Sequence, residues 1–190
     1  MINDLITLVE LTRQLVARKS DLDKAFFDNF IEPMWELFSK IHQDYKDSFT
    51  RYRELVTNEE GDPKELVYSL VETIKIDSLY TSDLRSNLNG LIRNIPSSTL
   101  KVSEGYLSSF VQAINRYFKR DYSNYPGYNY LLNLRAYLES SIKFQMDRPK
   151  YDQDIKEDIV PLIDASLRYV QANYELVAEA YYKLRKQLLS

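Results

Sequence analysis

The sequence lacks cysteine entirely and is poor in glycine, proline and histidine. Its 190 residues include 4 Gly, 6 Pro, 1 His and no Cys. The absence of cysteine excludes disulfides, thiolate nucleophiles, iron–sulfur clusters and cysteine-ligated zinc. Because so few Gly and Pro leave little material for the tight turns of a β-sandwich or barrel, an all-helical chain is favoured.

A long apolar run is also missing. The longest uncharged stretch, 122–134, is shorter than the roughly 20 residues that cross a bilayer, and it contains many polar side chains. Near the N-terminus, Asp4 and Glu10 interrupt the apolar pattern, whereas a secretory signal needs an unbroken apolar stretch. We therefore expect a cytoplasmic protein without a transmembrane segment.

The charges are nearly balanced. A net charge of −3, from 25 basic and 28 acidic residues, gives the chain no general attraction to nucleic acid or anionic lipid. Hydrophobic residues make up 44% of the chain, and at this length that is enough to bury one sizeable core without covalent staples. We expect a single domain spanning residues 1–190.

Apolar residues recur at spacings of three and four along most of the chain, which is the period of an amphipathic helix. The pattern predicts an all-α, single-domain antiparallel bundle of about six helices, with long helices near 22–56 and 152–188. Further helices are expected near 2–19, as a broken pair between 63 and 95, and near 107–118 and 130–142.

The long helix near 22–56 has two unlike halves. Pro33 removes a backbone hydrogen bond and predicts a kink near residues 29–32. After Ile41 the apolar stripe becomes narrow and its flanks become charged, so we expect an exposed or projecting arm over residues 41–56. Tyr45, Phe49 and Tyr52 on this arm are candidates for contact with a partner helix.

The last helix keeps a seven-residue repeat from Leu167 onwards. The two seam positions hold Leu167, Tyr174, Tyr181 and Leu188, and Val170, Val177 and Leu184. Small residues flank the seam, which favours an internal bundle helix over a two-stranded coiled coil. Pro161 is expected either to end a first segment of this helix or to kink it.

The residues needed for catalysis are scarce. His42 is the one histidine available to any Ser-His-Asp triad, no Ser stands in a Gly-x-Ser-x-Gly elbow, and the four glycines are isolated. His42 is interpreted as structural or interfacial. With no phosphate-binding loop either, we expect no enzyme, no cofactor and no metal.

An acidic run at 152–158 carries the one alternative for metal chemistry. Asp154 and Asp158 lie four apart on one helical face, so their carboxylates could help to hold Mg²⁺ or Ca²⁺ in a metal-assisted hydrolase. Acids at a helix N-terminus are also stabilised by the helix dipole alone, and this simpler explanation is favoured.

The segment 116–130 is the most informative local feature for function. It places basic residues at a helix end and tyrosines among Ser, Asn, Pro and Gly, which is typical of a binding loop. The candidate partner-binding residues are Arg116, Lys119, Arg120, Tyr122, Tyr125 and Tyr128. The same composition suits stacking of single-stranded bases, so an RNA or single-stranded nucleic-acid binder is the alternative.

The function expected from the sequence is therefore a non-catalytic protein–protein interaction module, such as an adaptor, a regulatory module or an assembly subunit. It would use the tyrosine-rich loop and the amphipathic arm. The 16 tyrosines support assembly or self-association, because a buried hydroxyl needs a partner and many of these side chains should lie at the margins of the bundle.

Overall fold

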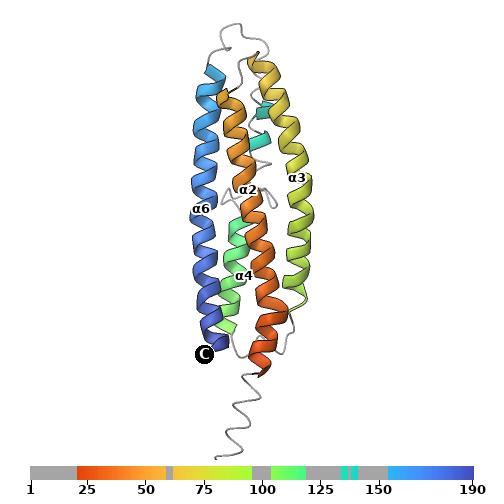
Figure 1. Cartoon of the computed structure of the whole chain (residues 1–190), viewed down its shortest axis with the longest axis vertical. Helices are drawn as coiled ribbons and strands as arrows, with labels where there is room; N and C mark the ends of the chain where they lie inside the picture. Colours follow the sequence, from red (N-terminus) through yellow and green to blue (C-terminus); the bar gives the residue numbers. More distant parts are fainter. Residues whose placement is uncertain (1–20, 59–61, 96–103, 119–133, 137, 141–153) are drawn as a thin grey trace, which may run out of the picture.

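The described chain is helical, as its sequence predicts. The computed structural model describes residues 21–58, 62–95, 104–118, 134–136, 138–140 and 154–190. Within these ranges there is no β-strand, and consecutive long helices run antiparallel to each other (Figure 1). The all-α fold class is confirmed. The helix expected near residues 2–19 lies outside the described residues.

Four helices build the described bundle: α2 (Glu32–Asn58), α3 (Pro63–Arg93), α4 (Glu104–Phe118) and α6 (Asp154–Leu189). The central helix, α2, packs against both α3 and α6, and α4 packs against α6 (Figure 1). α4 covers one half of the bundle's length. The short helical stretches 134–136 and 138–140 lie along the other half.

The predicted break in the helix between residues 63 and 95 is wrong, because α3 is one unbroken helix. Polar residues near its middle weaken the apolar stripe without ending the helix. The hydroxyl of Ser78 donates to the carbonyl of Ile74 at 2.7 Å, and that of Thr81 donates to the carbonyl of Asp77 at 2.9 Å. These polar side chains are satisfied within the helix, so the helix continues through them.

The irregularity predicted near residues 29–32 is a π-helical turn, η1 (Phe27–Ile31), and the chain is helical on both sides of it. Pro33 follows closely and lacks the N–H that a regular helix would donate to the carbonyl of Asn29. At the turn, the N–H of Glu32 donates to the carbonyl of Phe27, one residue further back than in an α-helix. The wide turn accommodates the proline.

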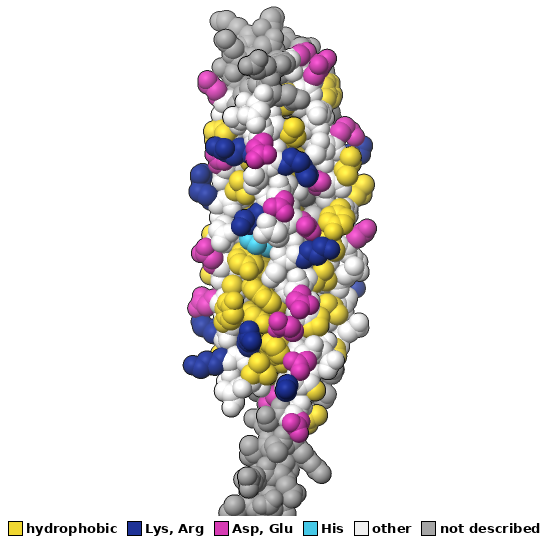
Figure 2. Space-filling model, viewed as in Figure 1, with side chains coloured by type: hydrophobic (Ala, Val, Ile, Leu, Met, Phe, Trp, Pro, Cys, Tyr) yellow, Lys and Arg dark blue, Asp and Glu magenta, His cyan; other side chains and the backbone are white. Residues whose placement is uncertain are grey.

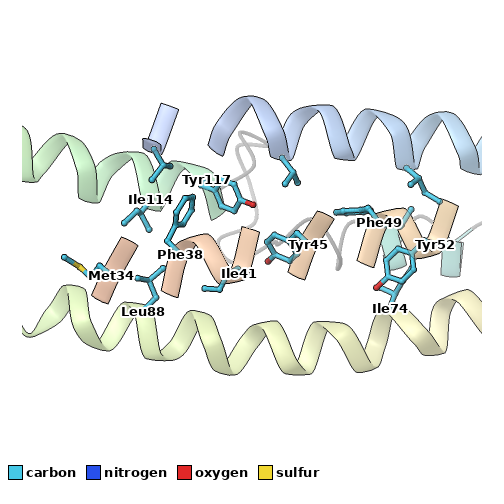
Figure 3. Packing of buried hydrophobic residues seen from close by; sticks show 14 of the residues in the cluster. Met34, Phe38, Ile41, Tyr45, Phe49, Tyr52, Ile74, Leu88, Ile114 and Tyr117 are labelled. Atoms are coloured by element: carbon cyan, nitrogen blue, oxygen red, sulfur yellow. The ribbon is translucent and has the colours of Figure 1, made fainter. Parts of the chain in front are cut away.

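The core is a column of large side chains centred on α2. Figure 3 shows Phe38, Tyr45, Phe49 and Tyr52 between α3 on one side and α6 with α4 on the other. The Phe38 ring meets the Tyr117 ring of α4 edge to face, with centroids 4.8 Å apart. Rings of this size reach two neighbouring helices at once, so they join α2 to both sides of the bundle.

The seam predicted for the last helix is confirmed. Val170, Val177 and Leu184 are fully buried, and Tyr181 stacks on Trp35 of α2 with centroids 4.4 Å apart. α6 is thus an internal bundle helix. It runs without interruption through Pro161, which therefore does not end a first segment.

Candidate protein-binding surface

The arm predicted over residues 41–56 does not project, and this expectation is wrong. Tyr45, Phe49 and Tyr52 are all 0% exposed, because α3 and α6 both cover the second half of α2. A narrow apolar stripe is enough to pack α2 against both neighbouring helices, because the tyrosine and phenylalanine rings on it are large. The three residues expected to meet a partner helix therefore meet helices of their own chain.

The other predicted binding segment, 116–130, is described only at its start. Arg116 is exposed in the last turn of α4, where a cation suits the negative end of the helix dipole. The remaining candidates, Lys119, Arg120, Tyr122, Tyr125 and Tyr128, lie outside the described residues.

His42 is buried where α2, α4 and α6 meet, in agreement with the structural role expected for it. Its side chain is 5% exposed, its ring stacks on Tyr174 at 4.0 Å, and its Nδ1 lies 3.1 Å from the Tyr117 hydroxyl. Burial, together with the positive charge of Lys46, lowers its pKa to about 4, against the raising effect of a hydrogen bond with Gln171. The imidazole is therefore neutral at pH 7.

Shallow grooves are found on the described surface. Four grooves of about 240 to 440 Å³ are lined by outward-facing side chains, and none of these four is lined by His42. Among the described residues no group of three potential metal ligands converges. In the acidic run 152–158, Asp158 is exposed, whereas the side chain of Asp154 lies outside the description.

A hydrophobic patch stands on the outer face of α3, and we call its three residues, Ile76, Leu79 and Tyr80, the α3 patch. They are 67%, 68% and 51% exposed. The spacings of three and four put them next to one another on the helix surface. Figure 2 shows hydrophobic side chains among charged ones along the right-hand edge of the molecule, where α3 lies in Figure 1. The Nζ of Lys40 lies 5.9 Å from the centre of the Tyr80 ring.

Polar residues in the same part of α3 face the core. Ser78 and Thr81 are buried, and the part-buried carboxylate of Asp77 accepts hydrogen bonds from the Tyr52 hydroxyl and the Arg51 guanidinium. Over residues 76–81 the helix therefore has its usual pattern reversed, with polar side chains inside and large apolar ones outside. Folding of the described bundle does not account for three large apolar side chains at these positions.

The surface around the α3 patch carries charges of both signs. Along α3, Glu65, Glu72 and Asp83 are exposed, and so are Lys75 and Arg93. On the neighbouring flank of α2, burial raises the pKa of Asp44, as do the negative charges of Asp47 and Asp77, while Lys40 lowers it. The surroundings of the patch are mixed, with a modest acidic excess.

A second hydrophobic area follows the seam between α2 and α6 in the lower half of Figure 2. Trp35 and Tyr174 of this seam are half-buried, with ring centroids 5.6 Å apart. Each also stacks on a buried ring, Trp35 on Tyr181 and Tyr174 on His42. Contacts among the described residues therefore account for the seam. For the α3 patch, the described residues supply the contact between Lys40 and Tyr80 and leave Ile76 and Leu79 about two-thirds exposed.

The sequence contains the signal for the α3 patch, although the weakened apolar pattern there also suggests a break in the helix. The core stripe of α3 runs through Leu70 and Ile74 and returns at Leu88. Continued at the helical period, it predicts residues 77, 78 and 81 inside and residues 76, 79 and 80 outside. The outward hydrophobic residues are identified by continuing the helical period of the stripe through the region where its apolar residues become sparse.

Comparison of the chain with protein-family models, with curated proteins and with solved structures finds no match. Among the described helices, none combines the length and the apolar character that crossing a membrane requires.

Proposed function

We propose that this chain is a non-catalytic protein-interaction module that binds its partner through the outer face of α3. The single observation that carries the proposal is the reversed pattern over residues 76–81. Ile76, Leu79 and Tyr80 face outward while Ser78 and Thr81 are buried.

The energetics favour a covered patch. Removing a large aliphatic side chain from water contributes about 1.5–3 kcal/mol, so covering Ile76 and Leu79 would stabilise a complex by a few kcal/mol. Tyr80 adds a rigid ring with a hydroxyl at its edge, a residue type enriched in protein interfaces. Large apolar side chains grouped on one exposed surface are typical of a binding site.

The architecture supports a binding role rather than a catalytic one. Stacked aromatic rings fill the bundle around His42, and the described grooves are shallow. A bundle of this kind offers rigid helical faces to a partner. In this proposal, the core of the module holds the α3 patch in place, and no reaction occurs at His42.

Photocrosslinking in the producing cell tests the proposal. A photoreactive phenylalanine analogue replaces Tyr80, and in a matched control it replaces Tyr182, which is 58% exposed on α6. We expect the probe at position 80 to give one dominant crosslinked protein. Leu79→Lys in the same chain should abolish that product, because it places a charge in the centre of the interface.

The control decides how the result is interpreted. The probe at position 182 should not yield the same product, and circular dichroism should show unchanged helix content for Leu79→Lys. If the probe at position 80 gives no product beyond those from position 182, or if Leu79→Lys leaves the product unchanged, the proposed function is wrong.

A further inference from the structure

We propose that the partner of the α3 face is a second copy of this chain, with the two α3 helices packed antiparallel about Leu79. This inference rests on the proposed function, since it names the occupant of the same surface. The order of charges and side-chain sizes along α3 supports it.

The outer face of α3 is a continuous stripe centred on Leu79. At 3.6 residues per turn, the positions within about 60° of Leu79 run from Glu65 to Arg93, a distance of four heptads and about 42 Å. The exposed residues on this stripe include Glu65, Lys75, Ile76, Ser82, Asp83 and Arg93. The stripe is long enough for two helices to pack along most of their length.

The charges on the stripe are self-complementary when one helix is reversed. Lys75 and Asp83 each lie four residues from Leu79, on opposite sides of it, and Glu65 and Arg93 each lie fourteen residues away. In an antiparallel pair centred on Leu79, each base therefore comes level with an acid of the other copy. A parallel pair would instead put every charge level with its own copy, which is repulsive.

Side-chain size follows the same reversal. Ile76 and Ser82 each lie three residues from Leu79, so Ile76 of each copy comes level with the small Ser82 of the other copy. Further along, Glu72 is level with Ser86. Gly90, near the end of the stripe, has no side chain, and an added Cβ there would contact nothing within 4 Å. This position therefore also leaves room for a side chain of the other copy. Small residues at these positions allow two helices to approach closely.

A different, basic partner fits this surface less well. A basic helix would favour a face of one sign, whereas Lys75 and Arg93 alternate with Glu65, Glu72 and Asp83 along α3. A heterologous basic partner is therefore treated as an outcome of the test.

The oligomeric state of the full chain in solution is the first measurement. Light scattering coupled to size exclusion, over a range of concentrations, should give a species of twice 22.5 kDa for the unmodified chain. Leu79→Lys should give a monomer at every concentration. Leu176→Lys is the matched control, because Leu176 is a 50% exposed leucine on α6, and it should remain dimeric.

Disulfide trapping then tests the orientation, which is practical because the chain has no cysteine of its own. Under mild oxidation, Leu79→Cys should give covalent dimers, because the symmetry axis sets position 79 against itself. Lys75→Cys should give few, since the two copies of position 75 are eight residues apart, about 12 Å along the helix. A mixture of Lys75→Cys and Asp83→Cys chains should give mixed dimers.

The charge reversal gives an independent check of register. Lys75→Asp should weaken dimerisation at least several-fold, and the double variant with Asp83→Lys should restore it. Efficient linkage of Lys75→Cys to itself would overturn the antiparallel arrangement.

Failure of this inference differs from failure of the proposed function. A monomer at all concentrations whose Tyr80 probe captures a different protein, sensitive to Leu79→Lys, overturns the dimer and leaves the α3 face as a binding site. A monomer whose Tyr80 probe captures nothing specific overturns both.

Discussion

At the scale of single residues, His42 shows how burial sets the charge of a group. Its ring is stacked and hydrogen-bonded inside the bundle, and its pKa of about 4 is well below the ordinary value of 6.5. The groups that face it are Lys46 on its own helix, Tyr117 on α4, and Gln171 and Tyr174 on α6. None of these is a carboxylate that would stabilise the imidazolium.

This burial predicts a specific loss of stability in acid. Because the folded pKa lies below the unfolded one, the contribution of His42 is fully present above pH 6.5 and is lost as the pH falls towards 4. At about 1.4 kcal/mol for each unit of pKa shift, the loss reaches about 3 kcal/mol. Urea denaturation of the unmodified chain and of His42→Asn, at pH 7 to pH 4, measures it.

The comparison between the two chains isolates the histidine. Carboxylates titrate in both chains over this range, so the difference between their unfolding free energies reports on His42 alone. His42→Asn should be less stable at pH 7, because it loses the stack on Tyr174, and the gap should narrow or reverse by pH 4. A gap that stays constant with pH would show that burial does not control this group.

At the scale of the helix pair, α2 and α3 are joined by a polar contact at the edge of the core. The hydroxyl of Tyr52 donates to the carboxylate of Asp77, which also binds the guanidinium of Arg51. Burial, followed by the negative charge of Asp77, raises the pKa of Tyr52, so the hydroxyl remains a donor at every physiological pH.

A double-mutant cycle measures this contact. Asp77→Ala removes the acceptor of a buried hydroxyl and should cost about 1–3 kcal/mol of unfolding free energy, whereas Tyr52→Phe should cost about 1 kcal/mol. With Tyr52→Phe already present, Asp77→Ala should cost less, with a coupling of about 1 kcal/mol. Glu179→Ala, which removes an exposed acid paired with Lys183 on α6, is the control and should be nearly neutral. Additive costs at positions 52 and 77 would contradict the contact.

The elements differ in how far local sequence decided them. The seven-residue repeat of α6 predicted its buried seam, because apolar residues repeated at this spacing all lie on one side of the helix. The middle of α3 was harder, since Ser78 and Thr81 interrupt the apolar stripe. Their hydroxyls bond within the helix, and the rings of Tyr45 and Tyr52 on α2 provide the apolar bulk at this level of the core. The sequence of α3 alone cannot show that side chains of another helix fill the core where its own side chains are polar.

At the scale of the whole molecule, one column of buried side chains joins the described helices, and this predicts cooperative unfolding. Trp35 is the chain's one tryptophan, and its stack on Tyr181 makes its fluorescence a reporter of the packing between α2 and α6. In guanidinium chloride, the midpoints from tryptophan fluorescence and from helical circular dichroism should coincide. Clearly separate midpoints would divide the bundle into independent units.

Local sequence determined three properties: that the described part of the chain is helical, that an irregular turn lies near Pro33, and which side of α6 faces inward. These properties depend on the backbone period and on the missing N–H of proline, which act over a few residues. Only the tertiary structure decided that Tyr45, Phe49 and Tyr52 are buried and that the α3 patch is exposed. The two sets of residues differ in exposure through the helices placed beside them: among the described helices, α2 has neighbours on two sides, and none covers the outer face of α3.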